Sequence, residues 1–598
     1  MKAVKKPARK LAKRPAMKSA NRPIMKQGSL RVSFGAVKDS YRRSLNKASR
    51  AGVIGQIMSR KPQPFSRSRE IQKLVANRLG WVDAATTMKR HIAGIEKFGK
   101  AVLADGIQHV VLMGMGGSSL CPELFGLMFG KHPKLKTFAV IDSTDPAAVR
   151  AVAKKIEPAR TLFIVASKSG GTVETRSQEA FFTGVLTDAG VKKPGRHFAV
   201  ITDPGSGLQE FAKKNRYRKI FLNPPDIGGR YSALSLFGLV PAFFAGVDLR
   251  LLLNDALFMQ KLLCEREGET SPAVVLGALL AAASKEGRDK LTFMASRKTA
   301  PLVPWIEQLV AESTGKKGKG VVPIEAEPMG KLDKYGKDRL FVQVKMHGER
   351  TAPQDAFMVA AEKKGYPVIQ VTLGNPYEVG RQFLLWEAAT AVTGFLFGIN
   401  PFDEPNVTES KNNTKAILSA FERSGEFPDQ LPHSRWGKLT LVAYDGARKY
   451  SYEQLTNLTK FLRAFLKGGK PPRYFTVLNY FKADRTSEKA LDEIRTLVRN
   501  KTGMATLRGF GPRYLHSIGQ LYKGGAPDGM FVVFVRGNYG RLEIPGQMYD
   551  FGQLIGAQAM GDAQALIKRK LPTLVIAVDG NPAEGLKAFG RALKSALK

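Results

Sequence analysis

The sequence predicts an α/β protein whose strands form parallel, doubly wound sheets. Short apolar runs of strand length alternate with stretches of helical periodicity in the first half of the chain, which is typical of a parallel sheet covered by helices on both faces. These runs occupy residues 110–115, 137–141, 161–166, 197–202 and 219–222. Ligands of such sheets bind at the carboxyl ends of the strands, so the loops that follow the runs are the first candidates for a functional site.

Composition and periodicity divide the chain into four parts. Residues 1–30 are rich in Lys, Ala and Pro and are expected to be disordered, whereas residues 31–100 carry a helical pattern. A first α/β domain is expected over residues 101–270, and it ends in a long helical passage. A second is expected over residues 271–598, with strand candidates at 291–295, 341–344, 367–371, 439–443, 475–479, 530–535 and 574–578.

The chain is strongly basic, with 94 Lys and Arg residues against 51 Asp and Glu residues and a formal net charge of +43. A nucleic-acid surface would explain this excess, but the chain lacks the interleaved aromatic residues and the motifs of such modules. We therefore expect a generally basic surface that attracts anionic metabolites and binds nucleic acid only non-specifically.

The sequence predicts a cytoplasmic protein without membrane contact. No apolar run approaches the roughly 20 residues that a membrane helix needs, and no apolar segment follows the basic N-terminus as in a signal peptide. Two cysteines, Cys121 and Cys264, do not suggest a disulfide framework.

Two of the expected strands end in loops rich in glycine and hydroxyl side chains. The first loop reads Gly116-Gly117-Ser118-Ser119, and the second reads Ser167-Lys168-Ser169-Gly170-Gly171-Thr172. A strand that feeds a helix through such a loop leaves backbone N–H groups unpaired, and hydroxyls and a lysine can complete an anion cradle. Either loop alone is more often a tight connection that needs positive φ, but the two together favour a phosphorylated small molecule.

These loops also carry a resemblance to a known family. Together with Gly228-Gly229-Arg230-Tyr231-Ser232, they resemble the signature loops of the glucose-6-phosphate isomerases, which have two sugar isomerase domains. The similarity is greatest to the isomerase half of bacterial fusions of transaldolase with this enzyme. It implies two doubly wound sugar isomerase domains, and the reversible conversion of glucose 6-phosphate and fructose 6-phosphate through an enediolate. This reaction needs a base, a cation near the developing oxyanion, an acid for ring opening and a phosphate anchor, but no metal or redox cofactor.

The resemblance assigns the base to Glu312. By spacing alone Glu312 is a glutamate at a helix end, which is usually a solvated surface acid. However, residues 308–316 resemble the family motif in which a glutamate precedes Ser-x-Gly-Lys and a glutamine, here Gln308, lies one helical turn earlier as a substrate contact. Arg230, beside Gly229, is expected to stabilise the enediolate, which suits a permanently charged planar cation. The remaining substrate and phosphate contacts are expected from Gly117, Ser118, Ser167, Lys168, Ser169, Thr172 and Gly229.

The C-terminal part supplies two further catalytic candidates by resemblance. Lys411 lies nine positions after Phe402, as in the family's Phe-Asp-Gln loop, although Glu404 stands where the family has glutamine. His516 lies in a Gly-x-x-x-x-His-x-x-x-Gln-Leu segment that resembles the element carrying the ring-opening histidine. Without the resemblance, Lys411 is one of many exposed lysines and His516 is a structural histidine. Because His516 follows Lys411 rather than preceding it, the second domain is expected to be permuted.

The resemblance also implies a homodimer, because the histidine of the family usually enters the site of the partner subunit. We expect this sharing to persist in the permuted chain. Two other functions stay open at this point. A non-catalytic sugar-phosphate sensor would keep the phosphate loop without needing the base, lysine and histidine together, and a nucleic-acid-binding protein would show steep salt dependence.

Overall fold

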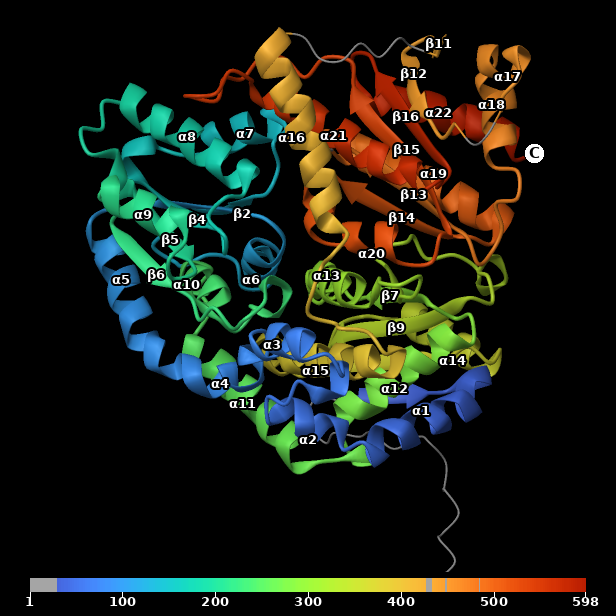
Figure 1. The fold of residues 1–598 in the computed structure, drawn as a ribbon, viewed down its shortest axis with the longest axis horizontal. Coiled ribbons are helices and arrows are strands. Elements are labelled where there is room, and N and C mark those ends of the chain that lie inside the picture. The colour runs from blue at the N-terminus through green and yellow to red at the C-terminus, as the bar shows by residue number, and fades with distance from the viewer. Residues whose placement is uncertain (1–29, 426–432, 447–448, 483) are drawn as a thin grey trace, which may run out of the picture.

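The computed structural model describes residues 30–425, 433–446, 449–482 and 484–598. The described residues form three β-sheets surrounded by helices (Figure 1), and most strands are parallel. The predicted α/β class with parallel sheets is therefore confirmed. The basic tail, which the sequence predicts to be disordered, lies outside the described residues except for Leu30.

The first sheet has five parallel strands in the order β3-β2-β4-β5-β6. Every residue of β2, β4 and β5 is buried, as expected for strands covered on both faces. Because Gly114 of β2 pairs with Ala166 of β4, the two glycine-rich loops leave the sheet side by side. The strands are β2 (His109–Gly114), β3 (Thr137–Ile141), β4 (Thr161–Ala166), β5 (Phe198–Thr202) and β6 (Lys219–Leu222). The helices are α6 (Leu120–Phe129), α7 (Pro146–Ala153), α8 (Val173–Asp188) and α9 (Gly207–Lys214).

The N-terminal segment is mainly helical, as expected, but it begins with a strand. Residues Leu30–Ser33 form β1, which pairs antiparallel with β10 at the edge of the second sheet. A run of four residues carries too little periodicity to be recognised, and the strand depends on pairing with a distant partner. The helices of this segment are α1 (Lys38–Arg50), α2 (Val53–Met58), α3 (Arg69–Ala76), α4 (Ala84–Thr87) and α5 (Ile92–Ala104).

The second sheet has the order β1-β10-β9-β7-β8. The helical passage before it, expected over 233–263, is two helices, because the chain turns at Gly246 (φ +82) and Asp248 then caps the second helix. The strands are β7 (Lys290–Ala295), β8 (Val322–Ile324), β9 (Arg339–Met346) and β10 (Val368–Leu373). The helices are α10 (Leu236–Phe244), α11 (Leu249–Glu265), α12 (Pro272–Lys285), α13 (Leu302–Thr314), α14 (Ala352–Lys363) and α15 (Val379–Phe397).

The third sheet has the order β11-β12-β16-β15-β13-β14. Residues 271–598, expected to form one second domain, thus contain two separate sheets. The reason is that the C-terminal strands bury their own two apolar faces, each under different helices. The strands are β11 (Ser434–Trp436), β12 (Leu439–Tyr444), β13 (Tyr474–Asn479), β14 (Ala505–Phe510), β15 (Gly529–Arg536) and β16 (Thr573–Val578). The helices are α16 (Val407–Ser424), α17 (Tyr452–Thr456), α18 (Leu458–Phe465), α19 (Arg485–Thr502), α20 (Gly519–Gly524), α21 (Phe551–Lys568) and α22 (Pro582–Ala596).

Helices α16 and α21 connect the third sheet to the first. They pack against each other between the two sheets (Figure 1). Leu418 of α16 and Leu554 of α21 belong to the same apolar cluster as Val165 of β4. This packing brings the C-terminal third of the chain to the glycine-rich loops of the first sheet. Across the described ranges, none of the helices is both long and apolar enough to cross a membrane.

Candidate active site

The two glycine-rich loops end beside segments from every part of the chain. A Cβ atom at Gly117 would lie 1.9 Å from the carbonyl oxygen of Gly229. A Cβ at Gly116, whose φ is +55, would lie 2.5 Å from the carbonyl oxygen of His516 and 2.8 Å from Nε2 of Gln308. Glycine is required here because the neighbouring backbone and side chains occupy the space of a side chain. The first loop thus lies where the predicted site residues converge.

Glu312 and Arg230 form an enclosed end of the site. Glu312, on α13, is 8% exposed, and its Oε1 lies 3.7 Å from Nη1 of Arg230. Gln308, one turn earlier, donates from Nε2 to Glu312 Oε2 at 3.3 Å. Burial, together with the charge of Glu404, raises the pKa of Glu312 to about 7 against the opposing charge of Arg230. A buried carboxyl with a pKa near neutrality is suited to act as a general base.

Arg230 is held by several groups of the enclosed end. Its Nε donates to Oγ of Ser313 at 2.8 Å, and its Nη2 donates to the carbonyl oxygens of Pro401 and Asp403 at 2.7 and 2.9 Å. Its Nη1 donates to Glu404 Oε2 at 2.9 Å. Although burial opposes it, the charges of Glu312 and Glu404 raise the pKa of Arg230. The residue that departs from the family pattern is therefore an ion-pair partner of the proposed oxyanion-stabilising group.

His516 lies at the junction between this enclosed end and an open cavity. Its carbonyl oxygen accepts a hydrogen bond from Gln308 Nε2 at 2.8 Å, and its Nε2 lies 3.0 Å from Oε1 of Glu174. Nε2 of Gln558 donates to the same Glu174 oxygen at 2.8 Å. Although burial opposes it, the charge and hydrogen bond of His516 lower the pKa of Glu174. Glu174 is thus an ionised orienting partner of the histidine.

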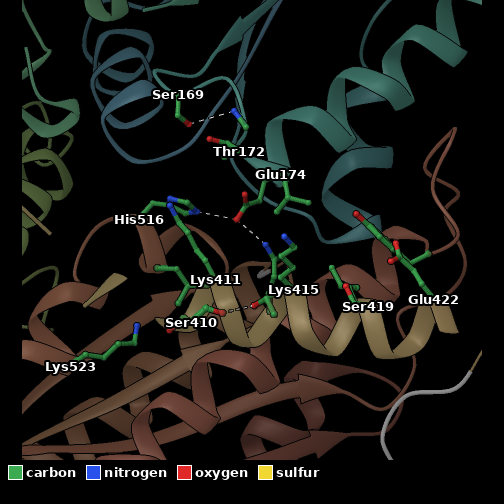
Figure 2. Close-up of a pocket in the computed structure, with 17 residues that line it drawn as sticks. Ser169, Thr172, Glu174, Ser410, Lys411, Lys415, Ser419, Glu422, His516 and Lys523 are labelled. Atoms are coloured by element: carbon green, nitrogen blue, oxygen red, sulfur yellow. Dashed lines mark hydrogen bonds and ion pairs between the residues drawn. The ribbon is translucent and has the colours of Figure 1, made fainter. Parts of the chain in front are cut away.

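The open part of the site is a cavity of about 480 Å³ between the second glycine-rich loop and α16. Lys411 and Lys415, one helical turn apart, point from α16 toward the loop that carries Ser169 and Thr172 (Figure 2). Neither lysine forms an ion pair among the described residues. Hydroxyls and a backbone loop facing two unpaired ammonium groups make an anion-binding site.

A buried network fixes the elements that line this cavity. Asp562 of α21 is fully buried, and its Oδ1 lies 2.7 Å from Nζ of Lys523 and accepts from Oγ of Ser410 at 2.9 Å. Its Oδ2 accepts from the hydroxyl of Tyr514 at 2.6 Å. Ser410 precedes Lys411 in the chain, and Tyr514 is two residues before His516. One carboxylate therefore connects both catalytic candidates of the C-terminal part.

Several sequence-predicted residues lie outside the cavity wall. Nζ of Lys168 pairs with Asp203 Oδ2 at 2.5 Å and donates to the carbonyl oxygen of Pro225 at 3.0 Å, so Lys168 faces away from the loop that it was expected to complete. Ser167 is buried, and its Oγ lies 3.0 Å from Thr172 Oγ1, which orders the loop from inside. The lysines that line the cavity near this loop come instead from α16.

Three further residues of the site, Glu174, Lys415 and Asp562, were not predicted from the sequence. Glu174 lies two residues after the second glycine-rich loop, in the first turn of α8, but nothing local shows that a histidine 342 positions later is its partner. Lys415 could have been predicted from Lys411, because residues four positions apart lie on the same face of a helix. In the described ranges, no group of three or more His, Cys, Asp and Glu side chains is arranged to hold a metal ion.

Comparison with known proteins decides the family. Residues 82–364 match the family model described as phosphoglucose isomerase. A glucose-6-phosphate isomerase of Carboxydothermus hydrogenoformans is 30% identical over 408 residues, which include 58% of this chain and 86% of that protein. This chain belongs to the phosphoglucose isomerase family. A glucose-6-phosphate isomerase of Thermus thermophilus is 28% identical over 384 residues, including 57% of this chain and 90% of that protein.

Two solved structures have a fold similar to that of this chain. A crystal structure of a glucose-6-phosphate isomerase from Chlamydia trachomatis aligns with a TM-score of 0.56 and 18% identity, covering 68% of this chain and 90% of that one. A hypothetical protein of Thermus thermophilus aligns with the same score at 25% identity, covering 65% and 100%. The family model includes Arg230 and Glu312 but ends before Lys411 and His516, so the case for these two residues rests on their position in the structure.

Proposed function

We propose that this phosphoglucose isomerase interconverts glucose 6-phosphate and fructose 6-phosphate, and that its own chain supplies every catalytic group. The observation that carries the proposal is the position of Glu312. It is a buried carboxyl with a pKa of about 7, next to a fixed arginine and connected through Gln308 to a histidine paired with a carboxylate. A proton shuttle between two adjacent carbons needs this arrangement of base, cation and acid.

The proposed reaction begins with phosphate capture in the open cavity. Ser169, Thr172, Lys411 and Lys415 would hold the phosphate, which places the sugar toward the enclosed end. His516, oriented by Glu174, would protonate the ring oxygen as the C1–O5 bond breaks, and the anomeric hydroxyl would lose its proton to water. Such a pair suits proton transfer because the carboxylate fixes the ring of the histidine and stabilises its charged form.

The isomerisation step follows at the enclosed end. Ionised Glu312 would take the proton from C2 of glucose 6-phosphate and return it to C1, passing through an enediolate. Arg230 would stabilise the negative charge that develops on the oxygens, and Gln308 would orient Glu312. The reverse reaction uses the same groups in the opposite order. No step requires a cofactor or a metal.

The proposal of an enzyme rather than a sensor is supported because Lys411 and His516 line the cavity and Gln308 connects Glu312 to His516. A non-catalytic sensor would not need all three residues. An assay that couples glucose 6-phosphate formation from fructose 6-phosphate to an NADP-dependent dehydrogenase tests this. We expect sustained turnover. Binding of fructose 6-phosphate without turnover would indicate a sensor. Steeply salt-dependent binding of nucleic acid with no turnover would indicate a nucleic-acid-binding protein. The homodimer and the cytoplasmic location stay predictions.

A further inference from the structure

The third sheet carries a second cavity, of about 770 Å³, that shares no residue with the catalytic cavity. It lies among the ends of β15 and β16 and the helices α16 and α21, the upper part of the third sheet in Figure 1. Its volume falls in the range of about 300–1,000 Å³ that is usual for small-molecule sites. The proposed isomerase reaction gives this cavity no role.

The floor of this second cavity is apolar. The strands and helices that meet there contribute Ile417, Val442, Val535, Ala557, Met560 and Ala577. A Cβ atom at Gly556 of α21, or at Gly540 in the loop after β15, would meet no other atom within 4 Å. The walls at these glycines are therefore open and flat, which leaves room for a planar ring system on an apolar surface.

Among the residues that the structure describes, one unpaired cation faces this cavity. Of the three charged residues in the wall, Asp550 caps α21 by accepting from the backbone N–H of Gln553 at 2.8 Å, and Arg541 pairs with Glu543 at 2.9 Å. Arg536 has no ion pair among the described residues, and its Nε is buried without a hydrogen-bond partner. A partly buried guanidinium without a counter-charge is a strong binding group for a phosphate or carboxylate.

The position of Arg536 in the sheet points to the same conclusion. The chain goes from β13 to β14 on one side and then to β15 on the other, so β13 and β15 flank the switch point of the sheet. Arg536 is the last residue of β15, and the hydroxyl of Tyr539 donates to the carbonyl oxygen of Tyr480, directly after β13. The cavity lies on the β16 side of this point, and none of the described residues that line it belongs to β13. Its link to the switch point is Arg536, at the carboxyl end of β15, where ligands of doubly wound sheets bind.

We propose that this cavity is a second ligand site, and that it binds a nucleotide-sized organic anion. Arg536 pairs with the anionic group, and the planar body of the ligand lies on the apolar floor beside Gly556. The ligand class is an aromatic or nucleoside monophosphate, because the wall, as far as its residues are described, offers one free cation rather than the several that a polyphosphate needs.

Binding of AMP to the full-length protein, measured by calorimetry, tests this site. Inorganic phosphate is the control for binding of the anionic group alone. Adenosine is the control for binding of the nucleoside without the anionic group. We expect AMP to bind at least about tenfold more tightly than either, and Arg536→Gln to weaken AMP binding by about tenfold or more, as loss of a charged hydrogen-bond partner does. Gly556→Phe, which fills the cavity, should abolish binding. Arg435→Gln, which removes an exposed arginine of the same sheet, should leave it unchanged.

Three results would overturn the proposal. The first is no AMP binding up to about 1 mM. The second is unchanged AMP affinity in Arg536→Gln and Gly556→Phe proteins that melt like the parent. The third is loss of AMP binding in Ser169→Ala, which would place the nucleotide in the catalytic cavity. None of these depends on isomerase turnover, so the test stands apart from the proposed function.

Discussion

The two ends of the active site are built differently. At the enclosed end, Arg230 has protein partners for all three of its nitrogen atoms, and Glu312 is almost completely buried. At the open end, Lys411 and Lys415 face a cavity of about 480 Å³ and have no ion-pair partner among the described residues. The enclosed end fixes its charges in advance, whereas the open end leaves cations free to meet an incoming phosphate.

The enclosed end and the open end therefore suit two different tasks. Burial raises the pKa of Glu312, which suits the role of base that we propose for the enclosed end. The open end supplies attraction for an anion, which needs accessible charge and not a shifted pKa. Substitutions at the enclosed end should therefore act mainly on kcat, and substitutions at the open end mainly on KM.

The largest effect is expected from Glu312→Gln, which keeps the size of the side chain but removes the base. Loss of a positioned general base typically lowers turnover by ~10²–10⁴-fold. The KM for fructose 6-phosphate should stay within a few-fold of the parent, as steady-state kinetics would show. Near-normal kcat in a folded Glu312→Gln protein would remove Glu312 from the mechanism.

A mixture of two inactive chains tests whether the two ends come from one chain. The resemblance predicts that His516 enters the partner's site, but the structure places His516 beside Gln308 of its own chain. Co-expressed Glu312→Gln and His516→Ala chains should therefore stay as inactive as each alone. Recovery of up to about half the parent activity per mixed dimer would instead show sharing across a two-fold interface.

Asp562→Ala tests the network that joins the two catalytic candidates of the C-terminal part. Both side chains of the Asp562–Lys523 pair are 1% exposed, so the variant leaves a buried lysine uncompensated. We expect the free energy of unfolding to fall by about 3–5 kcal/mol. Asp579→Ala is the matched control, because the Asp579–Arg435 pair is exposed and should contribute at most about 1 kcal/mol. Equal losses in chemical denaturation would argue against the network.

Lys415→Ala tests the open end. Removing one free cation should raise KM for fructose 6-phosphate by about tenfold, the size associated with a charged hydrogen bond, with kcat little changed. Lys415→Arg should keep most of the affinity. A fall in kcat at constant KM would place Lys415 in the chemical step and would contradict the division between the two ends.

The smallest effect is expected in the pH profile. Glu312 must be ionised to act as a base, and its pKa is about 7, so kcat/KM should fall about tenfold per pH unit well below that value. Because the charge of Glu404 contributes to the raised pKa of Glu312, Glu404→Gln should move this acid limb to lower pH. Asp403→Asn, whose carboxylate pairs with Lys316 at 2.7 Å, is the control and should move it less. An unmoved acid limb in Glu404→Gln would exclude this coupling.

The sequence by itself determined the local features of this protein. Apolar runs identified all five strands of the first sheet within a residue or so, because each run is bounded by loops, although only β2, β4 and β5 are buried throughout. The short strands β1, β8 and β11 were not predicted. Strand β14 was not predicted either, because Arg508 and Gly509 interrupt its apolar pattern. The motifs around Glu312 and Arg230 were recognisable because each is a continuous segment.

The tertiary structure alone decided which of these features meet. Glu174 pairs with a histidine 342 positions away, Arg230 with a glutamate 174 positions away, and Lys168 with Asp203 instead of the ligand loop. Division of the C-terminal half into two sheets, and the approach of His516 to the site of its own chain, depend on packing between separate apolar faces. Periodicity and motifs describe residues within a few turns of each other, whereas these contacts depend on how distant surfaces fit together.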